Sequence, residues 1–302
     1  MNKHKKYDAS SIEVLEGLEP VRRRPGMYIG GTDNASMHHL FSEVIDNAMD
    51  EAVANFASFI EVKVETDNTI SIYDNGRGIP IDPHPNFPNK SALEVIMTTL
   101  HAGGKFSNKV YQTSGGLHGV GISVVNALSE FVDVEVYRDK KIYNQKFSRG
   151  HPASKLKEIK KKTNKKGTKI SFKPDPEIFG PDNNFNCNKL YDFSKSKAYL
   201  FAGVEIRWFC DSEISKKENI PENDIFKFSQ GLIDLVQNEV DEKMSLISEI
   251  FSGNREKDKN NLSFEWAINW SLGTNTFLNS YCNTVPTPQG GTHELGLRGG
   301  LL

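Results

Sequence analysis

One segment, residues 35–56, constrains the fold of this chain more than any other. Its apolar positions recur at helical spacing, which predicts a helix with one flank packed on a core; they are Leu40, Val44, Ala48 and Ala52. Polar side chains form a stripe beside that flank, because residues three or four apart share one helix face; they are His39, Glu43, Asn47 and Asp50. A helix that is half core and half polar stripe indicates a site built along it.

Composition narrows the class of protein. The chain has 302 residues, enough for two ordinary domains, and its 37% hydrophobic and 25% charged residues are typical of soluble globular proteins. A formal net charge of -2 means that any contact with DNA has to be local. The three cysteines lack CxxC spacing, which argues against a zinc site or a disulfide framework. No apolar run is long enough for a membrane span, so we expect a cytoplasmic protein.

Local patterns predict further elements. Residues 10–13 have capping-box spacing, which predicts a helix that ends before Pro25. Alternating apolar residues predict two strands, 60–64 and 70–74, joined by a turn at residues 67–68. Helices are expected over 91–100 and 121–128, and strands over 132–136, after residue 141, and over 169–172. The lysine-dense run 155–166 favours a solvated loop, with a local phosphate-contacting patch as the alternative.

The character of the chain changes near residue 219, so we expect one domain over 1–218 and a second over 219–302. The second domain is expected to contain a helix within 226–251, a charged loop at 254–261 and an alternating strand within 262–270, with a parallel crossover.

Two glycine-rich stretches carry possible chemistry. Residues 101–121 are too long and irregular for a simple turn and indicate a mobile lid. The end of that stretch, residues 114–121, precedes a helix, so its backbone amides are suited to bind a polyphosphate. Neither a Walker loop nor a Rossmann glycine motif in its strand-to-helix context occurs in the sequence.

The polar residues suggest specific roles. Glu43 is a candidate general base for a water that attacks phosphorus, and His39, one turn earlier, is placed to orient it. Asn47 is placed to offer an amide oxygen to Mg²⁺. Asp74, at a strand end beside glycines, is suited to accept a hydrogen bond from the adenine amine, with Thr168 as a hydroxyl partner. The plain alternatives are a solvated helix face and a simple Asp-Asn-Gly turn.

The order and spacing of residues 43–52, 74–80 and 115–121 resemble the nucleotide motifs of the GHKL superfamily. Residues 22–30 and 100–106 are similar to those of the type IIA topoisomerase B subunits, and residues 284–294 and 82–85 resemble the topoisomerase IV branch more than the gyrase branch. The resemblance implies an α+β fold, in which a mixed sheet carries helices on one face. It also implies that a transducer domain of the ribosomal S5 type begins after this sheet.

The same resemblance implies site residues. Glu43 and His39 would be catalytic, and Asn47 would hold Mg²⁺. Arg138 would lie with Arg77 and Pro80 at the pocket mouth, where aminocoumarin-type inhibitors bind in the family. The residues implied around ATP are Tyr7, Asn47, Glu51, Asp74, Arg77, Gly78, Ile79, Pro80, Lys105, Gly116, Leu117, His118, Gly119, Val120, Gly121, Ile122 and Thr168.

The partners implied are ATP, a second copy joined through the N-terminal arm, and, in the intact enzyme of the bacterial cytoplasm, a topoisomerase A subunit and duplex DNA. Family members continue to a transducer lysine that contacts the γ-phosphate and to a metal-binding cleavage region, and both are absent from these 302 residues. An ATPase is therefore expected, with a nucleotide-binding dimerisation clamp of little turnover as the alternative. A histidine kinase or chaperone fits residues 290–294 less well.

Overall fold

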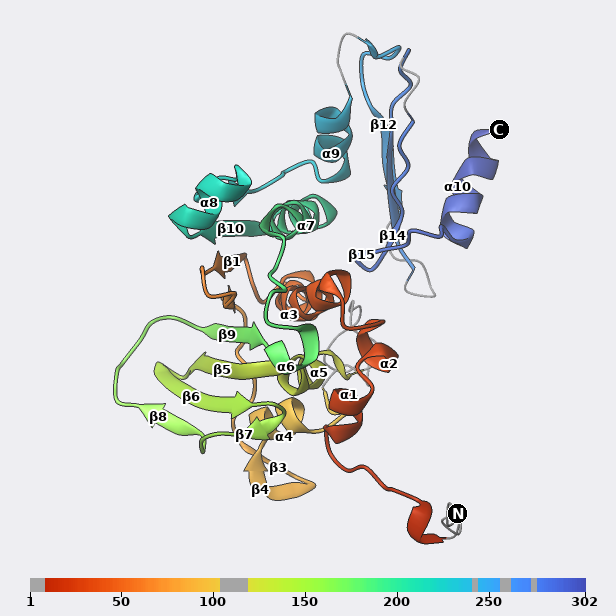
Figure 1. Ribbon diagram of the computed structural model, residues 1–302. Helices are drawn as coiled ribbons and strands as arrows, with labels where there is room; N and C mark the ends of the chain where they lie inside the picture. Colours follow the sequence, from red (N-terminus) through yellow and green to blue (C-terminus); the bar gives the residue numbers. More distant parts are fainter. Residues whose placement is uncertain (1–8, 104–118, 241–243, 256–261, 273–275) are drawn as a thin grey trace, which may run out of the picture.

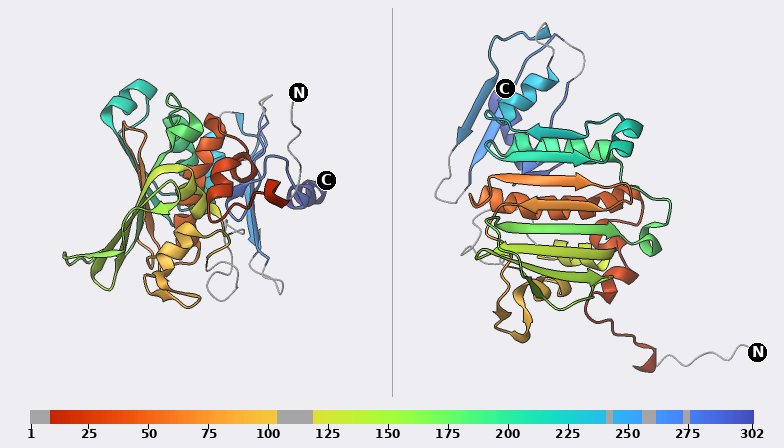
Figure 2. Two further views of the ribbon diagram at one scale, coloured as in Figure 1. Left: turned by 60° about the horizontal axis from the view of Figure 1, so that its bottom comes forward. Right: turned by 90° about the vertical axis from the view of Figure 1, so that its left-hand side faces the viewer.

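A mixed sheet is the frame of the molecule (Figures 1 and 2). The computed structural model describes residues 9–103, 119–240, 244–255, 262–272 and 276–302. In this part of the chain nine strands pair in the order β11-β10-β1-β2-β9-β5-β6-β7, and β8 also pairs with β6. Their bounds are β1 (Phe59–Val64), β2 (Ile70–Asp74), β5 (Ser129–Arg138), β6 (Lys141–Ser148), β7 (His151–Pro152), β8 (Lys157–Ile159), β9 (Gly167–Pro174), β10 (Glu205–Cys210) and β11 (Asn223–Phe226).

Helices cover one face of this sheet, as the left view of Figure 2 shows, which confirms the expected α+β fold with helices on one face. The core between the layers includes Phe41, Phe172 and Trp208, each at most 1% exposed. Burying a side chain of this size contributes about 1.5–3 kcal/mol. The helices before the second part of the chain are α1 (Glu19–Arg23), α2 (Gly26–Ile29), α3 (Asn34–Val53), α4 (Ala92–Thr98), α5 (Gly121–Ala127), α6 (Pro176–Phe179), α7 (Cys187–Leu200) and α8 (Ser212–Glu218).

The long helix α3 confirms the prediction for residues 35–56 to within a few residues. It begins where the Asp33 side chain accepts a hydrogen bond from the Ser36 backbone N at 2.8 Å, an N-cap that satisfies one free amide. It ends before Asn55, whose φ of 60° breaks the helical conformation. The predicted apolar flank is buried, with exposures of 3% or less at Leu40, Val44, Ala48 and Ala52.

The predicted hairpin of β1 and β2 is also present, with Ile60 opposite Asp74. Its turn uses Asn68 at φ 70°, a left-handed conformation that asparagine tolerates. On the sheet face away from the main core, Tyr73 packs edge-to-face against Phe59 and Tyr137, with ring centroids 5.8 and 5.6 Å away.

Two local predictions were wrong. Residues 10–13 do not open a helix: only a three-residue 3-10 turn, η1 (Ala9–Ser11), forms there, and α1 starts at Glu19. A helix there would have no apolar face to bury, because Ile12 and Val14 are 59% and 80% exposed. The run 155–166 is not all loop, because residues 157–159 form β8 on the open side of β6.

The second part of the chain contains α9 (Leu232–Glu239), the hairpin of β12 (Phe251–Arg255) and β13 (Phe264–Ile268), the hairpin of β14 (Tyr281–Cys282) and β15 (Val285–Pro286), and α10 (Thr292–Leu301). Both hairpins are antiparallel, so the expected parallel crossover is not seen in the described residues beyond 226. The last strand of the main sheet, β11, follows residue 219, and the division at that residue remains a prediction. A further hairpin, β3 (Pro83–His84) with β4 (Phe87–Ser91), precedes α4. No helix in the described residues is both long and apolar enough to cross a bilayer.

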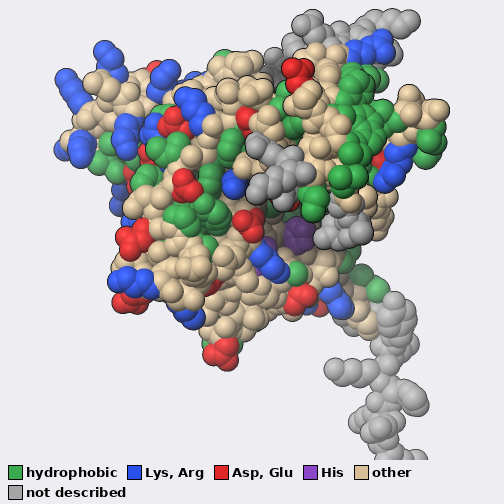
Figure 3. Space-filling model, turned by 90° about the horizontal axis from the view of Figure 1, so that it is seen from above, with side chains coloured by type: hydrophobic (Ala, Val, Ile, Leu, Met, Phe, Trp, Pro, Cys, Tyr) green, Lys and Arg blue, Asp and Glu red, His purple; other side chains and the backbone are tan. Residues whose placement is uncertain are grey.

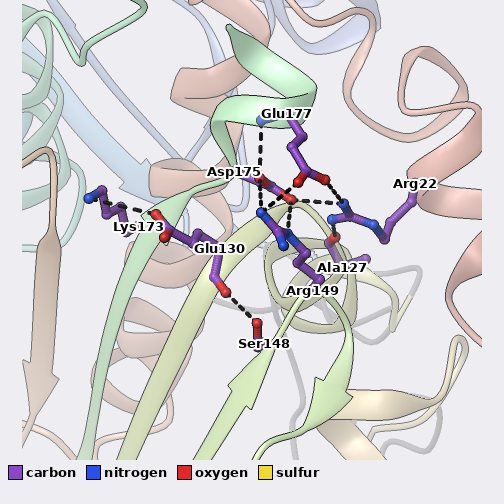
Figure 4. Close-up of polar contacts among 8 residues, drawn as sticks. All are labelled: Arg22, Ala127, Glu130, Ser148, Arg149, Lys173, Asp175 and Glu177. Atoms are coloured by element: carbon purple, nitrogen blue, oxygen red, sulfur yellow. Dashed lines mark hydrogen bonds and ion pairs between the residues drawn. The ribbon is translucent and has the colours of Figure 1, made fainter. Parts of the chain in front are cut away.

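A polar network ties the N-terminal segment to the sheet (Figure 4). The carboxylate of Asp175, which is fully buried, accepts hydrogen bonds from Arg22 at 2.8 Å and Arg149 at 2.9 Å. Arg22 also donates to the Ala127 carbonyl at the end of α5, at 2.7 Å. Since a buried carboxylate requires such partners, this network fixes α1 and the end of α5 against β9.

A buried ion pair joins α3, α7 and the second part of the chain. The Lys197 ammonium, 1% exposed, lies 2.6 Å from the Asp46 carboxylate of α3 and donates to the Thr284 carbonyl at 2.7 Å. Thr284 lies in the turn between β14 and β15. Desolvating a lysine is costly unless it is paired, so this contact depends on both elements remaining in place.

We expect Lys197→Met to lower the free energy of unfolding by about 3 kcal/mol, because the Asp46 carboxylate loses its buried partner. Urea unfolding followed by circular dichroism measures this. The matched control is Lys195→Met, two residues earlier and less buried, which should cost less than about 1 kcal/mol. Adding Asp46→Leu to Lys197→Met should recover most of the loss. Equal effects of the two single substitutions would contradict the assignment.

Candidate active site

Several of the predicted polar residues lie together at one end of the central strands. The end of β2 and the start of β9 pair so that Asp74 lies opposite Thr168. Helix α3 packs against β2 and α5, and its Glu51 reaches the turn after β2. The site therefore combines a strand end, a glycine-rich turn and two helices.

Asp74 is a buried carboxylate, 7% exposed, whose Oδ1 accepts a hydrogen bond from the Gly76 backbone N at 2.8 Å. Burial raises the pKa of Asp74 to about 7, and the nearby negative charge of Glu51 acts in the same direction. A ligand that donates a hydrogen bond to this carboxyl would stabilise its ionised form.

Two glycines allow the backbone to approach Asp74 closely. A Cβ at Gly76 would lie 2.7 Å from Asp74 Oδ1 and from Glu51 Oε2. A Cβ at Gly167, whose φ is 111°, would lie 1.8 Å from the Asp74 carbonyl oxygen. Larger residues are excluded at both positions, which accounts for the glycines on either side of the carboxylate.

The turn after Asp74 is held from two sides. The Thr168 hydroxyl, which is buried, accepts a hydrogen bond from the Ile79 backbone N at 3.1 Å. Arg138, at the end of β5, donates to the Gly78 carbonyl at 3.2 Å. Gly78 has a φ of 77°, which permits the reversal of the chain there.

Glu51 and Arg77 form the third support of this turn. Glu51 Oε2 accepts from the backbone N and Nε of Arg77 at 3.0 and 3.1 Å, and its Oε1 accepts from Arg77 Nη2 at 2.6 Å. The guanidinium lies 3.8 Å from the centre of the Phe56 ring. These contacts give Glu51 a positioning role: it fixes the turn and raises the pKa of Asp74.

On α3, Glu43 is half-buried and contacts the start of α5: a Cβ at Gly121 would lie 1.8 Å from Glu43 Oε2. The Asn47 side-chain nitrogen donates to the Glu43 carbonyl at 2.7 Å. That bond uses the amide nitrogen and not the amide oxygen, which is the atom that a Mg²⁺ ion would take. Among the described residues no group of three His, Cys, Asp or Glu side chains is arranged to hold a metal.

Of the other predicted residues, some are placed by the structure and the rest lie outside the described residues. His39 is exposed, one turn before Glu43, and Asp50 is buried at 2% exposure. Pro80 is exposed beside the half-buried Ile79. Gly119, Val120 and Ile122 lie with Gly121 at the start of α5. Five predicted residues lie outside the described residues: Tyr7, Lys105, Gly116, Leu117 and His118.

The sequence reasoning missed two supporting residues. Gly167 was not among the predicted site residues, although its close approach to Asp74 requires glycine. Asn75 was treated as part of a turn, but its Oδ1 accepts from the Ser58 and Phe59 backbone nitrogens at 2.8 and 3.0 Å, which ties the end of β2 to β1. The Asp-Asn-Gly pattern signals a turn and carries no sign of this second bond.

Comparisons with known proteins agree with this geometry. A family model described as Histidine kinase-, DNA gyrase B-, and HSP90-like ATPase matches residues 32–178, and one described as DNA gyrase B matches residues 231–302. The 43K ATPase domain of Thermus thermophilus gyrase B, solved in complex with an aminocoumarin, has a TM-score of 0.78 and is 36% identical. That match covers 93% of this chain and 70% of that chain.

Curated relatives point to the same group. The B subunit of DNA topoisomerase 4 from Bartonella bacilliformis is 56% identical over 98% of this chain and 43% of its own length. Its counterpart from Rickettsia prowazekii is 55% identical over 100% of this chain and 46% of its own length. The B subunit of DNA gyrase from a Synechocystis species is 44% identical over 97% of this chain. The chain thus spans about half the length of the topoisomerase 4 relatives, and the expected order of resemblance is confirmed.

We expect Asp74→Asn to weaken the binding of an adenine nucleotide by at least about tenfold, because a charge-assisted hydrogen bond of about 1.5–3 kcal/mol is replaced by an amide that presents either N or O. Calorimetric titration with a non-hydrolysable ATP analogue measures this. Asp82→Asn, at an exposed carboxylate just beyond the turn, is the control and should bind as the parent does. An affinity of Asp74→Asn within twofold of the parent would remove Asp74 from base recognition.

The raised pKa of Asp74, about 7, gives the site a pH dependence. In the empty site the carboxyl holds its proton below that pH, whereas the adenine amino group favours the ionised form. Binding therefore releases a proton, and affinity rises as pH increases through 7. We expect adenosine, which has no phosphate to titrate, to bind about tenfold more weakly at pH 6 than at pH 8. A flat NMR titration profile, or one of opposite slope, would contradict this, and Asp74→Asn should show no such dependence.

Proposed function

Because the chain belongs to the family of DNA gyrase and topoisomerase IV B subunits, we propose that it is the ATP-binding and ATP-hydrolysing part of a type IIA DNA topoisomerase. The observation that carries this proposal is the buried carboxylate of Asp74, which is paired in register with Thr168 and flanked by glycines. Such a position is suited to the edge of a purine base.

Adenine is selected by the direction of its hydrogen bonds. Its exocyclic amine donates to Asp74, whereas guanine presents a carbonyl oxygen at that edge and would be repelled by the carboxylate. Thr168 already accepts from the Ile79 backbone N, and its hydroxyl hydrogen remains to donate to a ring nitrogen. Arg77, Gly78, Ile79 and Pro80 line the mouth of this pocket with Arg138. An aminocoumarin is proposed to compete with ATP there.

Hydrolysis is assigned to α3. Glu43 is the general base that positions the attacking water and accepts its proton, and His39 supports it from the preceding turn. The Glu43 carboxylate contacts Gly121 at the start of α5, where the backbone amides of residues 119–122 are proposed to bind the phosphates. This contact favours a catalytic position for Glu43 over an ordinary solvated helix face.

Magnesium is proposed to bind through the Asn47 amide oxygen together with phosphate and water oxygens. When bound, the ion would neutralise charge on the β- and γ-phosphates. Asn47 is kept in place by its bond to the Glu43 carbonyl, so the ion and the general base would be aligned by the same turn of α3.

In the intact enzyme we propose that ATP binding drives DNA strand passage. The N-terminal arm, with Tyr7 reaching the partner's nucleotide, would join two copies, and a topoisomerase A subunit would supply the cleavage machinery. Lys105 and residues 116–118 would close over the phosphates. The proposed location is the bacterial cytoplasm.

We expect Glu43→Ala to retain binding of an ATP analogue within about threefold and to lower hydrolysis by about 10²–10⁴, the usual contribution of a general base. Single-turnover hydrolysis at saturating Mg-ATP measures the rate, and calorimetry measures the binding.

Glu213→Ala, an exposed glutamate on α8, is the control for loss of a helical carboxylate. If Glu43→Ala hydrolyses ATP at the parental rate, Glu43 is not the general base and belongs to an ordinary solvated helix face. Tight binding by the parent without turnover would favour the nucleotide-clamp alternative.

A further inference from the structure

A lysine-rich surface at one end of the sheet is not used by the proposed function. Residues 139–141 and 155–166 contain nine Lys but only two acidic residues, so they carry a formal charge of about +7. The whole chain carries -2, and the remainder therefore carries about -9. We call these two segments the lysine face. So strong a separation of charge creates a local positive potential on an otherwise acidic molecule.

The fold brings the two segments together. Strand β8 pairs with β6, which places Lys157 opposite Asn144 and Ile159 opposite Ile142. The Thr163 backbone N donates to the Lys140 carbonyl at 3.2 Å, so the loop after β8 lies against the turn between β5 and β6. Figure 1 draws β8 beside β6 at the left-hand end of the molecule, and Figure 3 shows Lys and Arg side chains at that end, where α8 also lies.

The charges of this face are turned to solvent. Residues 155–166 contain one acidic residue, Glu158, and it forms an ion pair with Lys141 at 2.9 Å. In the described part of the chain no ion pair engages the other lysines of residues 155–166, and all are exposed: Lys155, Lys157, Lys160, Lys161, Lys162, Lys165 and Lys166. The Lys165 ammonium also lies 5.2 Å from the centre of the Tyr73 ring, which keeps one charge on the outer face of the sheet.

Protection of a sheet edge does not account for this pattern. Lysines on an exposed strand prevent pairing with another molecule, but only Lys157 lies on β8 itself. Solubility does not account for it either, since interspersed charges of both signs serve that purpose without self-repulsion. The lysines of residues 160–166 lie beyond the strand and still carry one sign.

We infer that the lysine face binds the phosphate backbone of duplex DNA. Lysine ammonium groups contact phosphates as point charges without reading bases. Residues 155–166 contain no aromatic side chain, and so they lack the stacking platform that single strands require. The inference rests on the proposed function in one respect, that the intact enzyme acts on DNA.

The test uses the 302-residue chain and a fluorescein-labelled 30-base-pair duplex, with anisotropy measured from about 50 to 200 mM salt. The variant is Lys160→Gln with Lys161→Gln and Lys162→Gln. The matched control is Lys189→Gln with Lys216→Gln and Lys217→Gln, three exposed lysines on α7 and α8 at the other end of the sheet. Both triple variants lose the same charge, and neither touches the candidate active site.

We expect the residue 160–162 variant to bind the duplex at least about tenfold more weakly at 100 mM salt, with a salt slope smaller by up to about 2.7, while the control stays within twofold of the parent. Three results would overturn the inference: no binding by the parent at 50 mM salt, equal losses in the two variants, or displacement of the duplex by polyglutamate at equal charge concentration. Binding of an ATP analogue, measured in parallel on each protein, separates a failure of this inference from a failure of the proposed function.

Discussion

The pairing of β2 with β9 is the constraint on which the candidate site depends. Its antiparallel register sets Asp74 opposite Thr168, and Gly167 fits against the Asp74 carbonyl where a Cβ would come within 1.8 Å. A slip of one residue would turn both side chains to the opposite face of the sheet. The side chains of Asp74 and Thr168, which are proposed to recognise a base, are therefore positioned by the sheet itself, and loop residues only surround them.

That close packing also determines the electrostatics of the site. Burial removes water from the Asp74 carboxyl and raises its pKa to about 7. The negative charge of Glu51 raises the pKa further, because the hydrogen bonds of Glu51 to Arg77 hold it near Asp74. Glu51 thus stabilises the turn and, by its charge, leaves Asp74 in need of a donor. The adenine amine proposed as its ligand would supply that donor.

The sequence predicted the elements whose signal is local. Helix α3 and the β1–β2 hairpin follow from periodicity and turn residues, whereas the roles of Glu43 and Asp74 stay proposals. Three features depended on contacts between distant segments and were not predicted: β8, which forms because β6 offers it an open edge; the need for glycine at 167; and the pairing of Lys197 with Asp46. The capping-box pattern at residues 10–13 failed because no apolar face there has a core to cover, and propensity alone does not hold a short helix.

The Lys197 contact connects the site to the second part of the chain. Asp46 lies on α3 beside Asn47, and Thr284 lies in the turn of β14 and β15, where its φ is 69°. A buried ammonium that loses either partner is left poorly solvated, so separating the hairpin from α3 carries a cost of several kcal/mol by the usual range for such pairs. Helix α3 and this hairpin therefore move together more readily than apart.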